Sequence, residues 1–269
     1  MQLYIIPIVY ALLAWWFSTG VIIYLDGLPQ HTLMPSFAFL SLFLFLALVG
    51  ISTSRADISV SGAYLAFSCG IIVWGWQVAG FYMGFVTGPR RHACPPGCHG
   101  LAHFRHAVEA CLYHELAAVI GALVLLLISW QAPNQLALQT YLILWSLHEL
   151  AKLNVFFGVR NLNEEFLPDH MRYLSSFFSR KPINIFFPVS ISLATLLTGG
   201  LWQYTLAAGA NTFVAIGGSF LGCMAALGLL ELWLLVLPLP LHLWDWSLSS
   251  HRVHLEQAEI KAGLAVVRD

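Results

Sequence analysis

The chain has 269 residues, of which 59% are hydrophobic and 9% are charged, and its formal net charge is −1. A soluble domain carries about 25% charged residues, so this composition excludes a soluble enzyme and a disordered chain. The small net charge offers no basic surface for phosphate backbones, which excludes a nucleic-acid-binding protein. The composition instead indicates a polytopic membrane protein in contact with the lipid bilayer.

Seven stretches are apolar enough and long enough to cross the hydrocarbon core, which takes about 20 helical residues. In chain order they are Leu3–Leu25, Pro35–Ser52, Gly62–Val86, His106–Trp130, Leu136–Phe157, Ile183–Tyr204 and Thr212–Leu237. Transmembrane β-strands would alternate apolar and polar residues over about ten positions, whereas these runs are continuous. We therefore predict an all-α bundle of seven transmembrane helices over residues 1–250 and a polar cytoplasmic tail over residues 251–269. The first stretch lacks the basic segment of a signal peptide, so we expect it to remain as a span.

Basic residues are distributed unequally between the loops, and in membrane proteins they favour the cytoplasmic side. With the N-terminus outside, the loops and tail assigned to the cytoplasm hold Arg90, Arg91, Arg105, Arg160, Arg172, Arg180, Lys181, Arg252, Lys261 and Arg268. The opposite side holds Arg55 alone, and Lys152 lies inside the fifth span. The asymmetry predicts a periplasmic N-terminus and a cytoplasmic C-terminus.

Cysteine and histidine residues gather around the start of the fourth predicted span. Cys94-Pro-Pro-Gly-Cys98 is predicted to be a tight turn, which is either a structural loop with free thiols, a redox pair, or a metal site completed by His92 or His99. If the chain is helical from Gly100 onward, His99, His103, His106 and His114 share one face of that helix. This spacing suits metal ligation, and it equally suits the solvated start of an interfacial helix.

Ionisable side chains inside the predicted spans cost about 2.5–3.5 kcal/mol each at the bilayer centre, so they usually face the bundle interior and pair. We expect the cofactor-site candidates to converge in one polar pocket in the cytoplasmic half of the bundle; they are His114, Glu115, His148, Glu149 and Glu231. Three alternatives remain open: an ion-pair network that fixes packing, a proton path, and a site for a polar ligand group or metal. Glu149 and Lys152 are three residues apart, so local pairing is expected.

The polar run Arg160–His170 is expected to fold back over the cytoplasmic end of the bundle. Asn161 is predicted to cap a short helix that Pro168 ends. This would bring Glu164, Glu165 or His170 near His106 and His114.

Two cytoplasmic segments carry a family resemblance. They are T-G-P-R-R-H-A-C-P-P-G-C at Thr87–Cys98, leading to H-A-V-E-A-C-L-Y-H-E-L-A at His106–Ala117, and A-K-L-N-V-F-F-G-V-R-N-L-N-E-E-F-L-P-D-H at Ala151–His170. From about Tyr4 to about Asp245 the sequence resembles the PuhE-type photosynthetic complex assembly proteins of purple phototrophic bacteria. The resemblance implies a multi-pass protein of the bacterial inner (cytoplasmic or intracytoplasmic) membrane. Its implied partners are reaction-centre and light-harvesting subunits or pigment-synthesis proteins, and it implies no catalytic residue set.

Two functions follow as hypotheses. The first is a membrane assembly factor that assists the incorporation of pigment (bacteriochlorophyll) or subunits into the reaction centre and core light-harvesting complex, with His114 or His148 as an axial ligand of the pigment. The alternative is a membrane-bound, di-iron-like oxidoreductase acting on a pigment, lipid or quinone. Its candidate iron ligands are His106, His114, Glu115, His148, Glu149, His170 and Glu231.

Overall fold

The computed structural model describes residues 2–162, 164, 167–207 and 211–237, so the predicted tail 251–269 lies outside the described residues. The described part contains seven long α-helices and the 3₁₀ helix η2, and it contains no strand. The elements are α1 (Gln2–Asp26), α2 (Gln30–Ser54), α3 (Val60–Tyr82), α4 (Gly100–Ile128), α5 (Leu136–Phe157), η2 (Asp169–Phe177), α6 (Phe187–Ala207) and α7 (Thr212–Leu234). The predicted all-α class is confirmed.

The helix boundaries show where local chemistry modifies the apolar pattern. Helix α5 has the predicted bounds, whereas α2 begins before Pro35, which lies near the helix start and costs one backbone hydrogen bond there. Helix α6 begins at Phe187 rather than at Ile183 because the Asn184 side chain accepts hydrogen bonds from the backbone N–H groups of Phe186 and Phe187, at 2.9 and 3.0 Å. An asparagine used in this way fixes the turn that precedes a helix.

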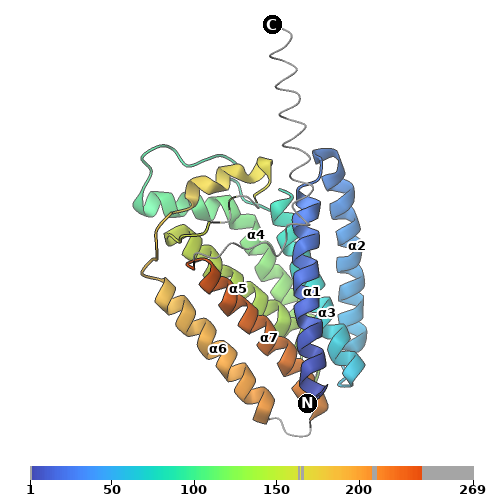
Figure 1. Cartoon of the computed structure of the whole chain (residues 1–269). Coiled ribbons are helices and arrows are strands. Elements are labelled where there is room, and N and C mark those ends of the chain that lie inside the picture. The colour runs from blue at the N-terminus through green and yellow to red at the C-terminus, as the bar shows by residue number, and fades with distance from the viewer. Residues whose placement is uncertain (1, 163, 165–166, 208–210, 238–269) are drawn as a thin grey trace, which may run out of the picture.

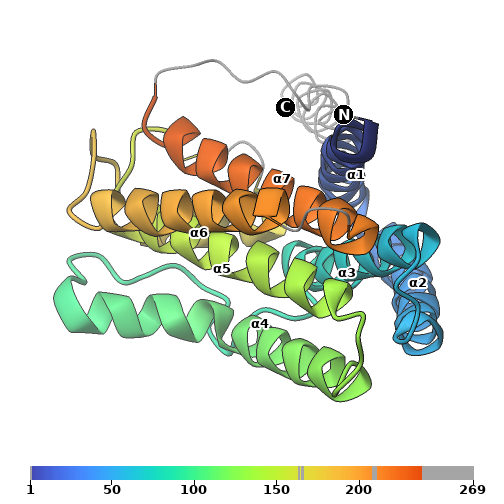
Figure 2. The same ribbon diagram turned by 90° about the horizontal axis from the view of Figure 1, so that it is seen from below.

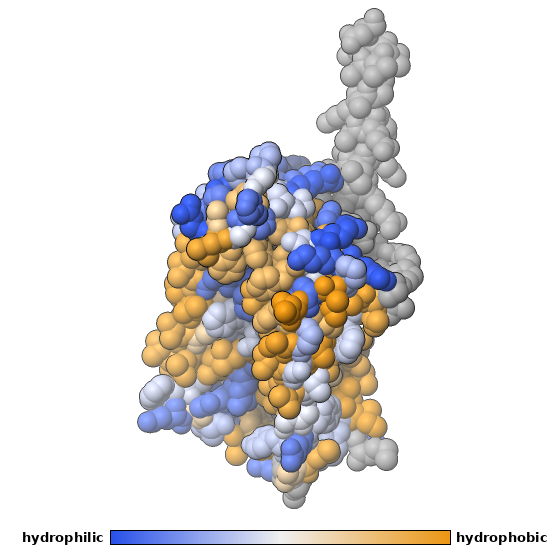
Figure 3. Space-filling view, turned by 90° about the vertical axis from the view of Figure 1, so that its left-hand side faces the viewer, coloured by the Kyte–Doolittle hydropathy of each residue, from blue (hydrophilic) through white to orange (hydrophobic). Residues whose placement is uncertain are grey.

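Five of the described helices are long and apolar enough to cross a membrane: α1, α2, α3, α4 and α7. Helices α5 and α6 have comparable lengths of 22 and 21 residues, but neither contains a stretch as apolar as those of the other five. Figure 3 shows apolar side chains over the middle of the molecule and hydrophilic ones towards its upper and lower ends. Among the exposed apolar side chains are those of Phe45 and Leu196, at 61% and 73% exposure, as expected of a surface that faces lipid.

Successive long helices run antiparallel, and α3, α5 and α7 form the centre of the bundle (Figures 1 and 2). Helix α3 packs against α1, α2 and α5, while α7 packs against α1, α5 and α6. The centre is tightly packed: the rings of Phe67 on α3 and Phe220 on α7 stack at 4.2 Å, and Tyr141 on α5 is fully buried. Helix α4 lies outside this centre, against α3 and α5.

Helix α4 is bent, and the preceding loop is wedged against it (Figure 2). The backbone N–H of His114 donates to the carbonyl of Thr87 at 2.9 Å, and the N–H of Arg90 donates to the carbonyl of Glu109 at 3.3 Å. Gly88 lies between these bonds, so close to α4 that a Cβ there would be 2.0 Å from the Glu109 carbonyl oxygen. Groups that enter the hydrogen-bond ladder are a recognised cause of helix kinks. The T-G-P-R segment therefore sets the direction in which the rest of α4 enters the bundle.

Candidate functional site

An ion triad joins α4 to α5 just beyond the bend. The Lys152 ammonium donates to Glu115 of α4, and at 2.7 Å to Glu149 of its own helix. The local pairing of Glu149 with Lys152 is confirmed, and Glu115 completes the group across the helix interface. The three side chains are 25–30% exposed. With all three ionised, two carboxylates face one ammonium, so the triad carries one uncompensated negative charge.

Two imidazoles and a tryptophan lie beside the triad. The ring of His114 lies 6.0 Å from that of His148 and 6.5 Å from that of Trp74, while His148 lies 5.5 Å from Trp74. His114 is 1% exposed, and neither of its ring nitrogens has a hydrogen-bond partner within the described part of the chain. The ring is therefore held by aromatic packing, including Phe81 at 4.8 Å.

The structure brings four of the five cofactor-site candidates together and places the fifth elsewhere. His114 and Glu115 come from α4, and His148 and Glu149 from α5. Glu231 is exposed on α7, where its charge interacts with Tyr82 at the end of α3. No described contact joins Glu231 to the triad.

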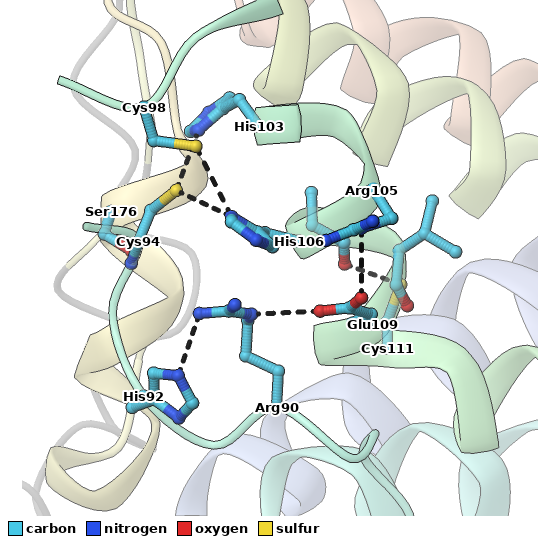
Figure 4. A network of polar contacts seen from close by, with 12 residues as sticks. Arg90, His92, Cys94, Cys98, His103, Arg105, His106, Glu109, Cys111 and Ser176 are labelled. Atoms are coloured by element: carbon cyan, nitrogen blue, oxygen red, sulfur yellow. Dashed lines mark hydrogen bonds and ion pairs between the residues drawn. The ribbon is translucent and has the colours of Figure 1, made fainter. Parts of the chain in front are cut away.

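The seven residues considered as iron ligands occupy several places rather than one. His106 lies in a separate cluster with Cys94 and Cys98 (Figure 4). His170 hydrogen-bonds the Tyr82 carbonyl oxygen through Nε2 at 2.9 Å. In the triad, the Lys152 ammonium already occupies the position between two carboxylates that a metal cation would need.

The segment after α5 folds back over the end of the bundle, where it packs against α4, but Glu164 and His170 contact Arg180 and the Tyr82 carbonyl rather than His106 and His114. Leu167, Met171 and Phe177 pack against Ala110 of α4. The helical part is η2, which follows Pro168. The Asn161 amide does not cap a following helix, because it donates to carbonyl groups at the end of α7 (Leu234 and Leu237, at 2.7 and 2.6 Å). Glu164 pairs with Arg180 at 3.4 Å, and Glu165 lies outside the described residues.

A cavity of about 320 Å³ lies between the start of α2, the loop after α3 and η2. Its polar lining includes Gln30, Arg91, His170 and Tyr173. Burial raises the pKa of the Tyr173 phenol above its ordinary value. His170 is part of the wall of this cavity, whereas no residue of the triad lines it.

Sequence reasoning missed two features of this region. It paired the cysteines with His92 or His99, whereas His92 contacts Arg90 at 2.9 Å and His99 contacts the carbonyl of Gly97 at 2.7 Å. It also did not predict that the T-G-P-R segment, Thr87–Arg90, forms hydrogen bonds with α4. The spacing of His103 and His106 could have identified the partners of the cysteines, because residues three apart lie on the same face of a helix.

The apolar helices and the paired charges between them define the class: a multi-pass helical membrane protein. The chain belongs to the family described as "Protein of unknown function (DUF3623)", which matches residues 1–254. It is similar to an uncharacterised 30.4 kDa protein in the puhA 5′ region of Rhodobacter capsulatus, with 36% identity over 243 residues that cover 88% of each chain. No solved structure matches the chain at a significant level.

Proposed function

We propose that this protein is a membrane assembly factor for the bacterial photosynthetic reaction centre and core light-harvesting complex. It binds a transmembrane helix of an incoming subunit at the triad of Glu115, Glu149 and Lys152. The relative from the puhA 5′ region of Rhodobacter capsulatus supports the proposal, together with the resemblance to photosynthetic complex assembly proteins. The apolar helices also support it, because a factor that binds a transmembrane helix must itself lie in the membrane.

The partly exposed triad is the observation that carries the proposal. Ionisable groups within membrane spans normally face the protein interior and pair there. These three side chains pair with one another but remain 25–30% exposed, with one carboxylate in excess. A partner helix that brings a basic or hydrogen-bond-donating side chain would neutralise the excess charge and remove it from lipid.

Binding of a partner helix needs less rearrangement than ligation of a bacteriochlorophyll. An axial ligand must present a free ring nitrogen to a wide, flat macrocycle. The His114 nitrogens are unpartnered, as ligation requires, but the residue is 1% exposed among aromatic rings. The pigment could reach His114 only if α4 and α5 separated, whereas the triad already lies at the surface of their interface.

The proposal includes a topology of seven spans with the N-terminus in the periplasm of the inner membrane. Two features support it. The long helices alternate in direction (Figure 1), and the loops rich in Arg and Lys, 83–99 and 158–186, lie at the same end of the bundle. Arg55 lies at the other end, in the loop between α2 and α3. Under the positive-inside rule the basic end is cytoplasmic.

The test replaces the chromosomal copy by Glu149→Gln, which keeps the size of the side chain and removes the excess charge. We expect the amount of assembled photosynthetic complex per molecule of this protein to fall several-fold, with the level of the protein itself unchanged. Glu164→Gln is the matched control, because its carboxylate is 46% exposed and pairs with Arg180 outside the triad. Equal losses of complex and protein, or an unchanged complex, would contradict the proposal.

A further inference from the structure

Two thiols and two imidazoles point toward one another beside the first turns of α4 (Figure 4). The Nδ1 atom of His106 is 3.5 Å from Cys94 Sγ and 3.4 Å from Cys98 Sγ. The Nδ1 atom of His103 is 3.2 Å from Cys94 Sγ. Neither cysteine is in a disulfide.

The local sequence builds this arrangement in a compact way. In the turn of Cys94-Pro-Pro-Gly-Cys98 the N–H of Cys98 donates to the Pro95 carbonyl at 3.1 Å, and Gly97 adopts a φ of +78° that suits glycine. The turn leads directly into α4. His103 and His106 are three residues apart, so both rings lie on the face of the helix that meets the turn.

We propose that Cys94, Cys98, His106 and His103 form a binding site for a soft divalent cation of the zinc type. Zn–S and Zn–N bonds of about 2.3 and 2.0–2.1 Å place sulfur and nitrogen ligands about 3.5 Å apart in a tetrahedron. The distances from His106 to the two thiols match this edge. Cys94, Cys98 and His106 are the group within the described residues whose ligand atoms all lie within 4.8 Å of one another.

His103 completes the proposed ligand set because its Nδ1 contacts Cys94 Sγ and its ring is oriented by its neighbours, but it lies outside the group of three whose ligand atoms are all mutually close. It stacks on Phe156 at 5.4 Å and lies 5.8 Å from Phe177 of η2. A site with four protein ligands is closed, which is typical of structural rather than catalytic zinc. Two thiolates and two imidazoles favour zinc over hard cations such as Mg²⁺.

The surrounding contacts indicate what the cation would do. The Cys94 N–H donates to the Ser176 hydroxyl at 2.9 Å, which ties the turn to η2. Four residues earlier, Arg90 binds Glu109 of α4 through its side chain at 3.2 Å. A cation would therefore clamp the loop and η2 onto α4 and hold the wedge that bends this helix. Its binding converts two thiols into thiolates and releases their protons to water.

The first test is metal analysis of the purified full-length protein. We expect about one zinc per chain in the wild type, and less than a tenth of that in Cys94→Ser, Cys98→Ser and His106→Ala. Cys111→Ser and His99→Ala are matched controls and should retain zinc, because the Cys111 thiol bonds only to carbonyl groups of its own helix within the described residues, and His99 contacts Gly97. Wild-type protein that remains metal-free after incubation with Zn²⁺ would overturn the proposal, as would equal losses in the controls.

A second measurement uses the wild type alone and so does not depend on the folding of variants. Zn²⁺ should slow alkylation of Cys94 and Cys98 at least tenfold, as followed by mass spectrometry, and should leave Cys111 unchanged. Mg²⁺ should protect none of them. Protection of all three thiols, or of none, would overturn the site. His103→Ala should weaken zinc retention beyond the roughly 10–100-fold loss caused by removal of outer-shell partners, and unchanged retention would exclude His103 as a ligand.

Discussion

Replacing Gly88 by alanine would place a methyl group where the backbone of α4 already lies. The new Cβ would be 2.0 Å from the Glu109 carbonyl oxygen and 2.7 Å from the Ala110 carbonyl carbon. These are backbone atoms of a helix and cannot move aside alone. The loop would have to retreat and would lose two hydrogen bonds with α4: the one that the His114 N–H donates to the Thr87 carbonyl and the one that the Arg90 N–H donates to the Glu109 carbonyl.

The expected loss follows from these contacts. Two backbone hydrogen bonds contribute about 1 kcal/mol each, and overpacking costs about 1–3 kcal/mol, so Gly88→Ala should lower the free energy of unfolding by about 3–5 kcal/mol. The assay is reversible unfolding in detergent micelles by titration with SDS. Gly200→Ala in α6 is the control, since a Cβ there meets no atom within 4 Å and alanine favours helix by up to about 1 kcal/mol. A Gly88→Ala protein within about 1 kcal/mol of the wild type would refute the wedge as the cause of the bend.

Three further predictions concern other parts of the molecule. Lys152→Met leaves two carboxylates facing each other, so the unfolding free energy in nanodiscs should fall by about 1–3 kcal/mol, less than the 3–5 kcal/mol of a fully buried pair; an unchanged value would mean that the triad is not formed. Gly218→Ala places a Cβ 2.1 Å from Thr205 Oγ1 across the α6–α7 contact and should cost about 1–3 kcal/mol, and a double-mutant cycle with Thr205→Ala should show that relief of the clash recovers part of the loss. Ser59→Ala removes the side-chain hydrogen bond that lowers the pKa of Asp57, so NMR titration should show this pKa moving up. Because a lowered carboxyl pKa contributes stability that is lost as pH falls, the variant should depend less on acid pH near about 4; an unchanged titration would exclude the hydrogen bond as the cause.

Much of the fold follows from the apolar pattern alone. Helix α5 could be placed despite its three ionisable residues because polar residues flank it on both sides and one turn pairs Glu149 with Lys152. The apolar pattern predicts the fourth span only from His106, whereas α4 begins at Gly100, because polar residues such as His103 and Arg105 interrupt the apolar stretch there. Composition distinguishes apolar from polar segments, but it does not distinguish a helix in the interface from a loop.

The candidate site was predictable only in part, for a geometric reason. The cost of charges in the membrane identifies Glu115, His148 and Glu149 as residues that must find partners. Their partners depend on which helices face each other. The bend in α4 determines which of its residues face α5. The same cost applies to Glu231, but it is exposed on α7 and no described contact joins it to the triad. His106 joined the cysteines instead of the other iron-ligand candidates because it lies before the bend, about two turns ahead of His114.

Photo-crosslinking in the native membrane tests the central claim most directly. A photoreactive residue replaces Leu142, which is 38% exposed and lies seven residues before Glu149, on the same face of α5. The same probe at Leu196, 73% exposed on α6, is the control. We predict that the Leu142 probe captures a reaction-centre or core light-harvesting subunit, that Glu149→Gln abolishes the capture, and that the Leu196 probe captures neither subunit. Capture of no such subunit at Leu142, or equal capture at both positions, would contradict the proposal that the triad binds an incoming helix.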